Sequence, residues 1–88
     1  FKEYWENGNK HVITTYKSGK LNGLYKEYWK NGNLKVKMKY KNGEKDGKGL
    51  MFYKDGTIKQ NGQYANDQKA GTWKIFDRSG DLLKKKTY

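Results

Sequence analysis

The stretch LYKEYWKNGNLKVKMKYKNG, residues 24–43, decides the fold. Its second half alternates apolar residues with lysines, the apolar positions being Leu34, Val36, Met38 and Tyr40. Successive side chains of a β-strand point to opposite faces, so this alternation predicts a half-buried strand. An aromatic-rich run, residues 24–29, precedes it, and the dipeptide Asn31-Gly32 lies between the two. Two strand-like runs joined by Asn-Gly predict a β-hairpin.

The hairpin unit recurs every 24 residues without a gap, with repeats starting at Phe1, Tyr25, Gly49 and Trp73. Aromatic and glycine columns align across these repeats, as in the two glycine columns Gly8, Gly32, Gly56, Gly80 and Gly23, Gly47, Gly71. We expect these glycines at turns, where residues with positive φ are needed. The chain is thus one repeat domain, 1–88, with repeats 1–24, 25–48 and 49–72 and a partial repeat 73–88. We expect it to be a fragment of a longer array.

The length of the hairpin loop decides which face each side chain takes, because a shift of one residue exchanges the faces. A two-residue turn would pair Trp29 with Leu34, whereas a three-residue loop, 30–32, would pair Tyr28 with Leu34. We favour the second, because it places the regular apolar columns on one face, namely Tyr28, Leu34, Val36, Met38 and Tyr40, and in later repeats Phe52, Ile58, Tyr64, Phe76, Leu82 and Tyr88. The opposite face then carries Trp5, Trp29, Tyr53 and Trp73.

Hairpins in series predict an all-β fold, an elongated single-layer antiparallel β-meander of about eight short strands. No helical periodicity is present. Each end of such a sheet is an unpaired edge, so pairing between copies of the chain through edges or ends stays open.

The amino-acid composition favours some kinds of binding partner over others. Of 88 residues, 33% are hydrophobic, 33% are charged and 16% are aromatic, which argues against one large core but also against disorder. The net charge is +11, and Arg78 is the only arginine among 20 basic residues. Such a surplus favours an acidic partner. Lysine lacks the bidentate geometry used to recognise bases, so nucleic acid is not favoured. Alternatively, the lysines only keep an aromatic-rich sheet soluble.

No residue pattern predicts catalysis, a cofactor or a metal. Cysteine is absent and His11 is the only histidine, in an ordinary strand position. The acidic residues are scattered, and Ser18-Gly19-Lys20 is a turn rather than part of a phosphate-binding loop. We therefore expect no enzyme. The sequence does not decide between a cytoplasmic and an exported protein.

Aromatic residues interleaved with lysines are the feature most suited to binding, because Trp and Tyr dominate protein interfaces. The candidate partner-binding residues are Trp5, Tyr25, Trp29, Tyr53, Trp73, Lys35, Lys37 and Lys39. The alternative is that the aromatic rings pack between repeats as the only core the sheet has. We give this alternative the greater weight, since few aliphatic residues are available.

The unit of residues 24–35, followed by residues 40–47, resembles a MORN-repeat variant found in bacterial YwqK-type antitoxin proteins. Gly49, Asp67 and Asp77 depart from the pattern of the second repeat. The resemblance implies serial hairpins and a non-catalytic, protein-binding or scaffold role in a bacterial protein that is itself antitoxin-like or immunity-like. We expect an acidic protein partner, and the alternative is an anionic surface, either acidic phospholipid or polyanionic glycan.

Overall fold

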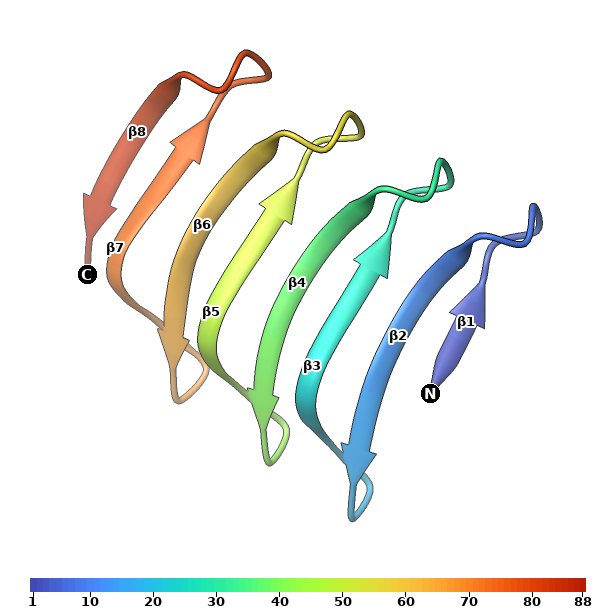
Figure 1. Cartoon of the computed structure of the whole chain (residues 1–88). Coiled ribbons are helices and arrows are strands. Elements are labelled where there is room, and N and C mark those ends of the chain that lie inside the picture. The colour runs from blue at the N-terminus through green and yellow to red at the C-terminus, as the bar shows by residue number, and fades with distance from the viewer.

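The computed structural model describes all 88 residues and contains one eight-stranded sheet (Figure 1). The strands follow one another in chain order and each pairs antiparallel with the next. They are β1 (Lys2–Tyr4), β2 (Lys10–Lys17), β3 (Lys20–Tyr28), β4 (Leu34–Lys41), β5 (Glu44–Phe52), β6 (Ile58–Ala65), β7 (Gln68–Phe76) and β8 (Leu82–Thr87). The predicted single-layer β-meander is confirmed. Its dimensions are 34 × 32 × 10 Å, and seven strand intervals of about 4.8 Å span a similar length.

Three-residue loops close the hairpins at one end of the sheet, which we call the loop end. In the second hairpin the amide of Gly32 donates to the Trp29 carbonyl at 2.9 Å, and the amide of Trp29 donates to the Asn33 carbonyl at 2.8 Å. Gly32 has a φ of 92°, which glycine adopts without steric cost. Tyr28 consequently pairs with Leu34, as the longer loop predicted. The same pairing recurs at Tyr4–Lys10, Phe52–Ile58 and Phe76–Leu82.

A bulge directly after each loop overturns part of the predicted face assignment. The pair after Tyr28–Leu34 is Glu27–Val36, so Lys35 is an extra residue in β4. Beyond the bulge the strand changes face. The face that carries Tyr28 and Leu34 therefore does not carry Val36, Met38 and Tyr40, which point to the other face of the sheet. The prediction that all five share one face was wrong. Their counterparts in the later repeats, Tyr64 and Tyr88, were misplaced for the same reason.

Two-residue turns close the other end of the sheet, which we call the turn end. Both central residues of each turn have positive φ, as in Ser18 (52°) and Gly19 (81°). This is the type I′ geometry that matches the twist of the flanking strands. Asn66 (51°) and Asp67 (69°) form the same turn, so Asp67 replaces glycine without a change of turn type.

Gly23, Gly47 and Gly71 do not lie in turns, in contrast to the prediction. Each occupies the interior of a strand, in β3, β5 and β7, with a positive φ of 105°, 105° and 67°. Around Gly23 the register shifts so that one residue of β2 faces three of β3. A glycine permits the local bend, and Figure 1 shows the resulting curvature of the strands.

Only four residues are buried, namely Thr14, Met38, Gly49 and Trp73. All four belong to one row that crosses the sheet, in which Thr14 pairs with Tyr25, Tyr25 with Met38 and Met38 with Gly49. Trp73 is 5% exposed, and its ring stands edge-on to that of Tyr64 at 5.0 Å between centroids. This row is the core, and we call the face that carries it the aromatic face. No helix of the structure could cross a membrane.

Candidate functional site

Three aromatic side chains form a row along the loop end of the aromatic face. Trp5, Trp29 and Tyr53 each follow the first strand of a hairpin, and each is half-buried. Each donates a hydrogen bond to the next repeat: Trp5 Nε1 to the Tyr28 carbonyl at 3.0 Å, Trp29 Nε1 to Phe52 at 3.3 Å and Tyr53 Oη to Phe76 at 2.8 Å. We call Trp5, Trp29 and Tyr53 the aromatic row. Its rings are thus fixed to the neighbouring hairpin.

A cation from the following repeat covers each ring of the aromatic row. Lys30 Nζ lies 5.2 Å from the Trp5 ring centroid and Lys54 Nζ lies 5.3 Å from that of Trp29. Arg78 stands 5.7 Å from the Tyr53 ring. These distances fit cation–π contacts, which leave the ammonium group at an exposed site in contact with water.

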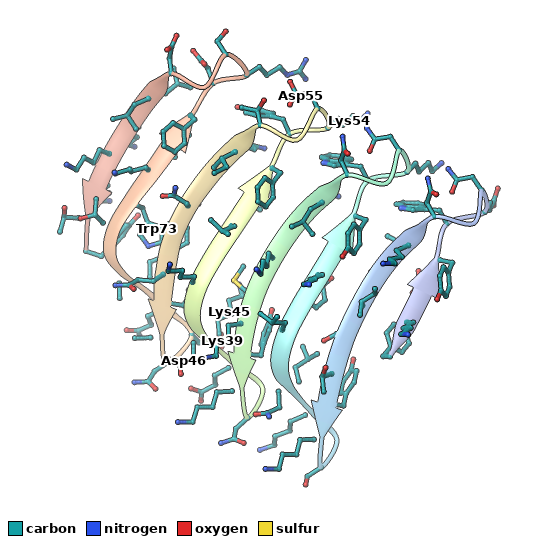
Figure 2. The ribbon with its side chains drawn as sticks, viewed as in Figure 1. Lys39, Lys45, Asp46, Lys54, Asp55 and Trp73 are labelled. Atoms are coloured by element: carbon teal, nitrogen blue, oxygen red, sulfur yellow. The ribbon has the colours of Figure 1, made fainter.

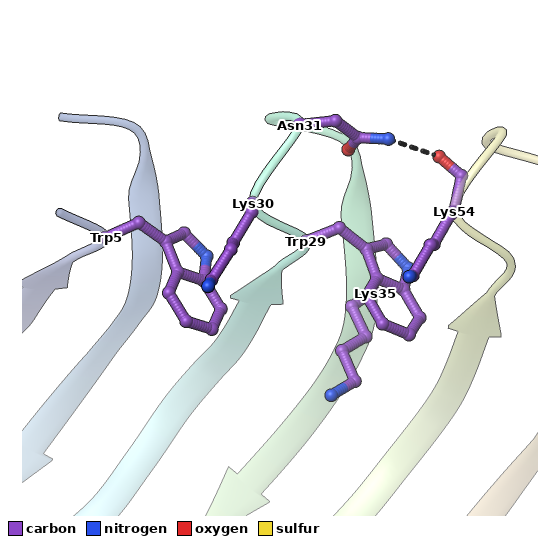
Figure 3. Close-up of a pocket in the computed structure, with 6 residues that line it drawn as sticks. All are labelled: Trp5, Trp29, Lys30, Asn31, Lys35 and Lys54. Atoms are coloured by element: carbon purple, nitrogen blue, oxygen red, sulfur yellow. Dashed lines mark hydrogen bonds between the residues drawn. The ribbon is translucent and has the colours of Figure 1, made fainter. Parts of the chain in front are cut away.

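A cleft lies between Trp5 and Trp29 (Figure 3). Its volume is about 430 Å³, and its lining residues are Trp5, Trp29, Lys30, Asn31, Lys35 and Lys54. Lys35, the bulge residue, reaches Trp29 from the same repeat at 4.6 Å. The bulge therefore has a second consequence besides the change of face, because its extra residue adds a cation to the lining of the cleft.

Asparagine side chains hold adjacent loops together. The amide groups of Asn31 and Asn33 both donate to the Lys54 carbonyl, at 2.8 and 2.7 Å, and Asn7 and Asn9 donate to the Lys30 carbonyl in the same way. The next loop has Asp55 and Thr57 at these positions, and neither has an amide to donate. The first three loops are thus cross-linked by pairs of hydrogen bonds, whereas the third and fourth are not.

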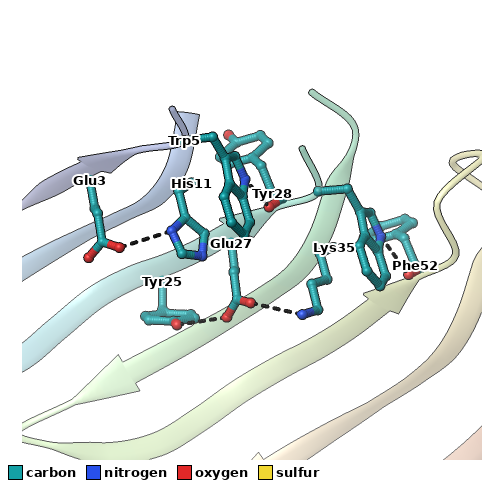
Figure 4. A network of polar contacts seen from close by, with 9 residues as sticks. Glu3, Trp5, His11, Tyr25, Glu27, Tyr28, Lys35 and Phe52 are labelled. Carbon is teal, nitrogen blue, oxygen red and sulfur yellow. Dashed lines mark hydrogen bonds and ion pairs between the residues drawn. The ribbon is translucent and has the colours of Figure 1, made fainter. Parts of the chain in front are cut away.

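A polar network lies beside the aromatic row (Figure 4). Glu27 accepts a hydrogen bond from Tyr25 Oη at 3.0 Å and forms an ion pair with Lys35 at 3.1 Å. The pKa of Tyr25 is raised to about 12, mainly by burial of the phenol and to a smaller extent by its hydrogen bond to Glu27.

The equivalent position of the first repeat holds histidine in place of lysine. His11 Nδ1 lies 2.9 Å from Glu3, and the imidazole stacks on Trp5 at 3.7 Å between centroids. Glu27–Lys35 is the only ion pair between a carboxylate and a lysine or arginine, and Glu3–His11 is the one other contact between an acidic and a basic side chain. Both glutamates lie on the aromatic face.

The opposite face, which we call the lysine face, has a different charge pattern. One row of paired residues crosses all eight strands: Lys2, Ile13, Lys26, Lys37, Leu50, Asn61, Lys74 and Lys85. It contains five lysines and no acidic residue. Lys26 stands directly opposite Lys37, and Lys74 directly opposite Lys85. Like charges in directly opposite positions destabilise a sheet, so this row is costly to the fold.

An apolar row accompanies the lysines on the same face, toward the loop end. Its members are Tyr4, Tyr28, Leu34, Phe52, Ile58, Phe76 and Leu82. Tyr4 and Leu82 are more than half exposed. Toward the turn end, Lys39 and Lys48 line a hollow of about 380 Å³ together with Lys37. The lysine face thus offers both charge and apolar contact area.

A family model described as the MORN repeat variant matches residues 1–18, 21–42, 45–66 and 69–88. Each matched segment contains one hairpin. The chain belongs to the MORN repeat variant family. No curated protein and no solved structure matches it, so the relation to YwqK-type antitoxins stays a prediction.

The MORN sheet separates the predicted partner-binding residues into groups. Trp5, Trp29 and Lys35 line the cleft at the loop end, and Tyr53 continues the aromatic row one repeat further along. Tyr25 is half-buried in the network, and Trp73 is buried in the core. Lys37 lies on the lysine face. Figure 2 places Lys39 toward the turn end and Lys54 at the loop end.

Several residues of these surfaces were not singled out from the sequence: Lys30 and Lys54 over the rings, and Lys26, Lys74 and Lys85 on the lysine face. Lys30, Lys54 and Arg78 occupy one repeat column, directly after the aromatic row, and this column was the available signal. No group of His, Cys, Asp or Glu side chains is arranged to hold a metal ion.

Proposed function

We propose that this MORN chain is a non-catalytic binding module that docks an acidic protein on its lysine face. The observation that carries the proposal is the row of five lysines without an acidic residue, including the opposed pair Lys26–Lys37. Repulsion within this row weakens the isolated fold. An acidic partner would relieve the repulsion, and complementary charge also accelerates and orients association.

The apolar row favours a protein over a purely anionic surface. Phe52, Ile58 and Phe76 border the lysines on the same face. Aromatic and aliphatic contacts at the centre of an interface contribute most of its binding energy, while charges set orientation. A partner that places acidic side chains beside an apolar patch would use both parts of the face. An antitoxin-like or immunity-like role is one form that such docking could take.

The test uses three forms of the chain as bait to capture partners from a bacterial lysate, at low and at near-physiological salt. The first bait is the wild type. The second bait carries Lys26→Gln, Lys37→Gln and Lys74→Gln on the lysine face. The third, with Lys17→Gln, Lys20→Gln and Lys41→Gln at the turn end, loses the same charge from exposed positions. We expect an acidic protein to bind the wild type and the third bait at both salts, and to be lost by the second. Equal binding to all three would refute the proposed face.

Binding to anionic phospholipid or glycan is the second candidate, supported by the predominance of lysine over arginine. Lysine acts as a mobile point charge and suits diffuse attraction to a polyanion. The same three baits would be applied to heparin and to vesicles containing phosphatidylserine. If binding occurs only at low salt and falls equally with both triple substitutions, the net charge of the chain rather than the lysine face causes it.

A further inference from the structure

We infer that the aromatic row, Trp5, Trp29 and Tyr53, is a second binding site, which takes an acidic peptide segment in the polyproline II conformation with an acidic residue at every third position. The inference rests on the proposed function, in that the partner is an acidic protein. It concerns the other face of the sheet and specifies the form of the segment recognised there.

The charges of the site are available to a ligand. Lys30 and Lys54 cover the rings of Trp5 and Trp29, and neither forms an ion pair. Lys35 is paired with Glu27, so it contributes little net charge. Arg78 is less available, because it lies near Asp55, whose pKa is lowered by the Thr57 backbone N–H and, to a smaller extent, by Arg78. The site is therefore two adjacent cationic positions, Lys30 and Lys54, one repeat apart.

The aromatic rings and the loop backbone of the site are held in place before any ligand binds. The ring of Trp5 is held by its hydrogen bond to the Tyr28 carbonyl, and that of Trp29 by its bond to Phe52. The Lys30 and Lys54 carbonyls each accept two asparagine amides from the preceding loop. A site ordered in advance loses less conformational entropy on binding.

The spacing of the repeats selects the conformation of the ligand. Equivalent positions in adjacent hairpins are two strands apart, which is about 9.6 Å. A polyproline II helix has three residues per turn and rises about 3.1 Å per residue. The side chains of residues i and i+3 therefore lie on the same side, about 9.3 Å apart. The mismatch is only about 0.3 Å per repeat. Acidic side chains at positions i and i+3 would thus meet Lys30 and Lys54 in turn.

Other regular conformations fit this spacing less well. Side chains on one side of a β-strand recur about every 6.7 Å or 13.4 Å, and residues three apart point to opposite sides. In an α-helix the nearest match is seven residues, about 10.5 Å, a mismatch of about 0.9 Å per repeat. The aromatic rings also favour polyproline II, because such segments dock in grooves lined by aromatic residues and are already extended in solution.

The test uses two acetylated, amidated peptides of identical composition, (Glu-Pro-Ala)₄ and a permuted peptide in which the four glutamates are contiguous. Binding to the full chain would be followed through the indole N–H resonances, with buried Trp73 as the internal reference. We expect the regularly spaced peptide to bind about threefold to tenfold tighter, since each correctly placed exposed ion pair contributes a small factor. The resonances of Trp5 and Trp29 should shift, whereas that of Trp73 should not.

Two variants with equal change of charge locate the site. Lys30→Gln with Lys54→Gln should abolish the preference for the spaced peptide, whereas Lys37→Gln with Lys74→Gln, on the lysine face, should retain it. Circular dichroism of both variants would check the fold. Equal affinity for the two peptides, or tighter binding of the contiguous one, would overturn the inference. The proposed docking of an acidic protein would stand or fall separately, by the lysine-face triple substitution.

A third peptide addresses the helical alternative. An alanine-rich helical peptide with glutamates seven residues apart that bound more tightly than (Glu-Pro-Ala)₄ would also overturn the inference. In that case the aromatic row would bind an acidic helix.

Discussion

The ring of Trp73 lies directly over Gly62, so that a Cβ atom added at Gly62 would overlap the indole. Gly49 has a similar place in the core, where an added Cβ would meet Met38 Sδ and the Tyr64 ring, both at 3.0 Å. The large and small residues of this row are therefore complementary. In a single-layer sheet, such contacts between neighbouring strands replace the contacts between layers that stabilise most domains.

Gly62→Ala should destabilise the fold by about 1–3 kcal/mol, because overpacking displaces the indole. Urea denaturation would measure the change. Gln63→Ala, at the adjacent exposed position, should change stability by less than about 0.5 kcal/mol. The cost of Gly62→Ala should be smaller in a Trp73→Leu background. An equal cost in both backgrounds would show that the indole does not cause the effect.

Thr57→Asn should stabilise the chain by about 0.5–1 kcal/mol, because it supplies the missing amide between the third and fourth loops. Asn33, the equivalent residue one repeat earlier, donates to the Lys54 carbonyl at 2.7 Å. A new asparagine should donate to the Arg78 carbonyl in the same manner. The reciprocal change, Asn33→Thr, should destabilise by a similar amount. Thermal unfolding of both variants would test the pair, and changes of the same sign would contradict it.

Lys37→Gln should stabilise the isolated chain by about 0.2–1 kcal/mol at low salt, since it removes the repulsion from Lys26 across the strand pair. The gain should shrink as salt is added, because the charges are near the surface. Lys2→Gln, in the same row but opposite the uncharged Ile13, is the control for net charge. If both variants behaved alike at every salt concentration, total charge rather than the opposed pair would explain the effect.

Tyr25 should ionise only at strongly alkaline pH. Its pKa is raised from 10.0 to about 12 by burial, and next by the hydrogen bond to Glu27. A raised pKa favours the neutral phenol in the folded state. The stabilisation that the neutral Tyr25 phenol contributes is therefore complete below about pH 10, and it is lost as the pH rises through about 12.

Tyrosinate absorbance of the wild type and of Tyr25→Phe would give the titration of this one group by difference. Glu27→Gln should lower the pKa of Tyr25, since it removes the charge that opposes ionisation. A difference titration centred near 10 in the wild type would contradict the prediction.

The sequence was sufficient to predict the hairpins, the loops and their order, because these depend on local patterns. Asn31-Gly32 specified the loop, and the regular aromatic columns favoured the correct pairing of Tyr28 with Leu34. The bulge at Lys35 was not predictable from alternation. Leu34, Lys35 and Val36 alternate apolar and polar as in a regular strand, although the chain changes face between them. Because the extra residue, Lys35, is polar, it fits the alternating pattern and gives no sign of the bulge.

The candidate binding surfaces were only partly predictable. Trp5, Trp29 and Lys35 were selected by residue type, and the structure brings them together. The contact of Lys30 with Trp5 joins residues of different repeats, so it depends on how neighbouring loops stack. Trp73 was selected by residue type but is 5% exposed. Its burial follows from the absence of a side chain at Gly62, which lies on a different strand.

The sheet is one layer thick, so each strand contributes to two surfaces at once. Val36 and Lys37 are neighbours in the chain, yet their side chains lie on opposite sides and share no neighbour across the strands. Substitutions on one side therefore leave the chemistry of the other unchanged, provided the backbone is kept. A single hairpin duplicated along the chain can acquire a new specificity on either side independently. Each further copy of the hairpin would extend both surfaces by the same two strands.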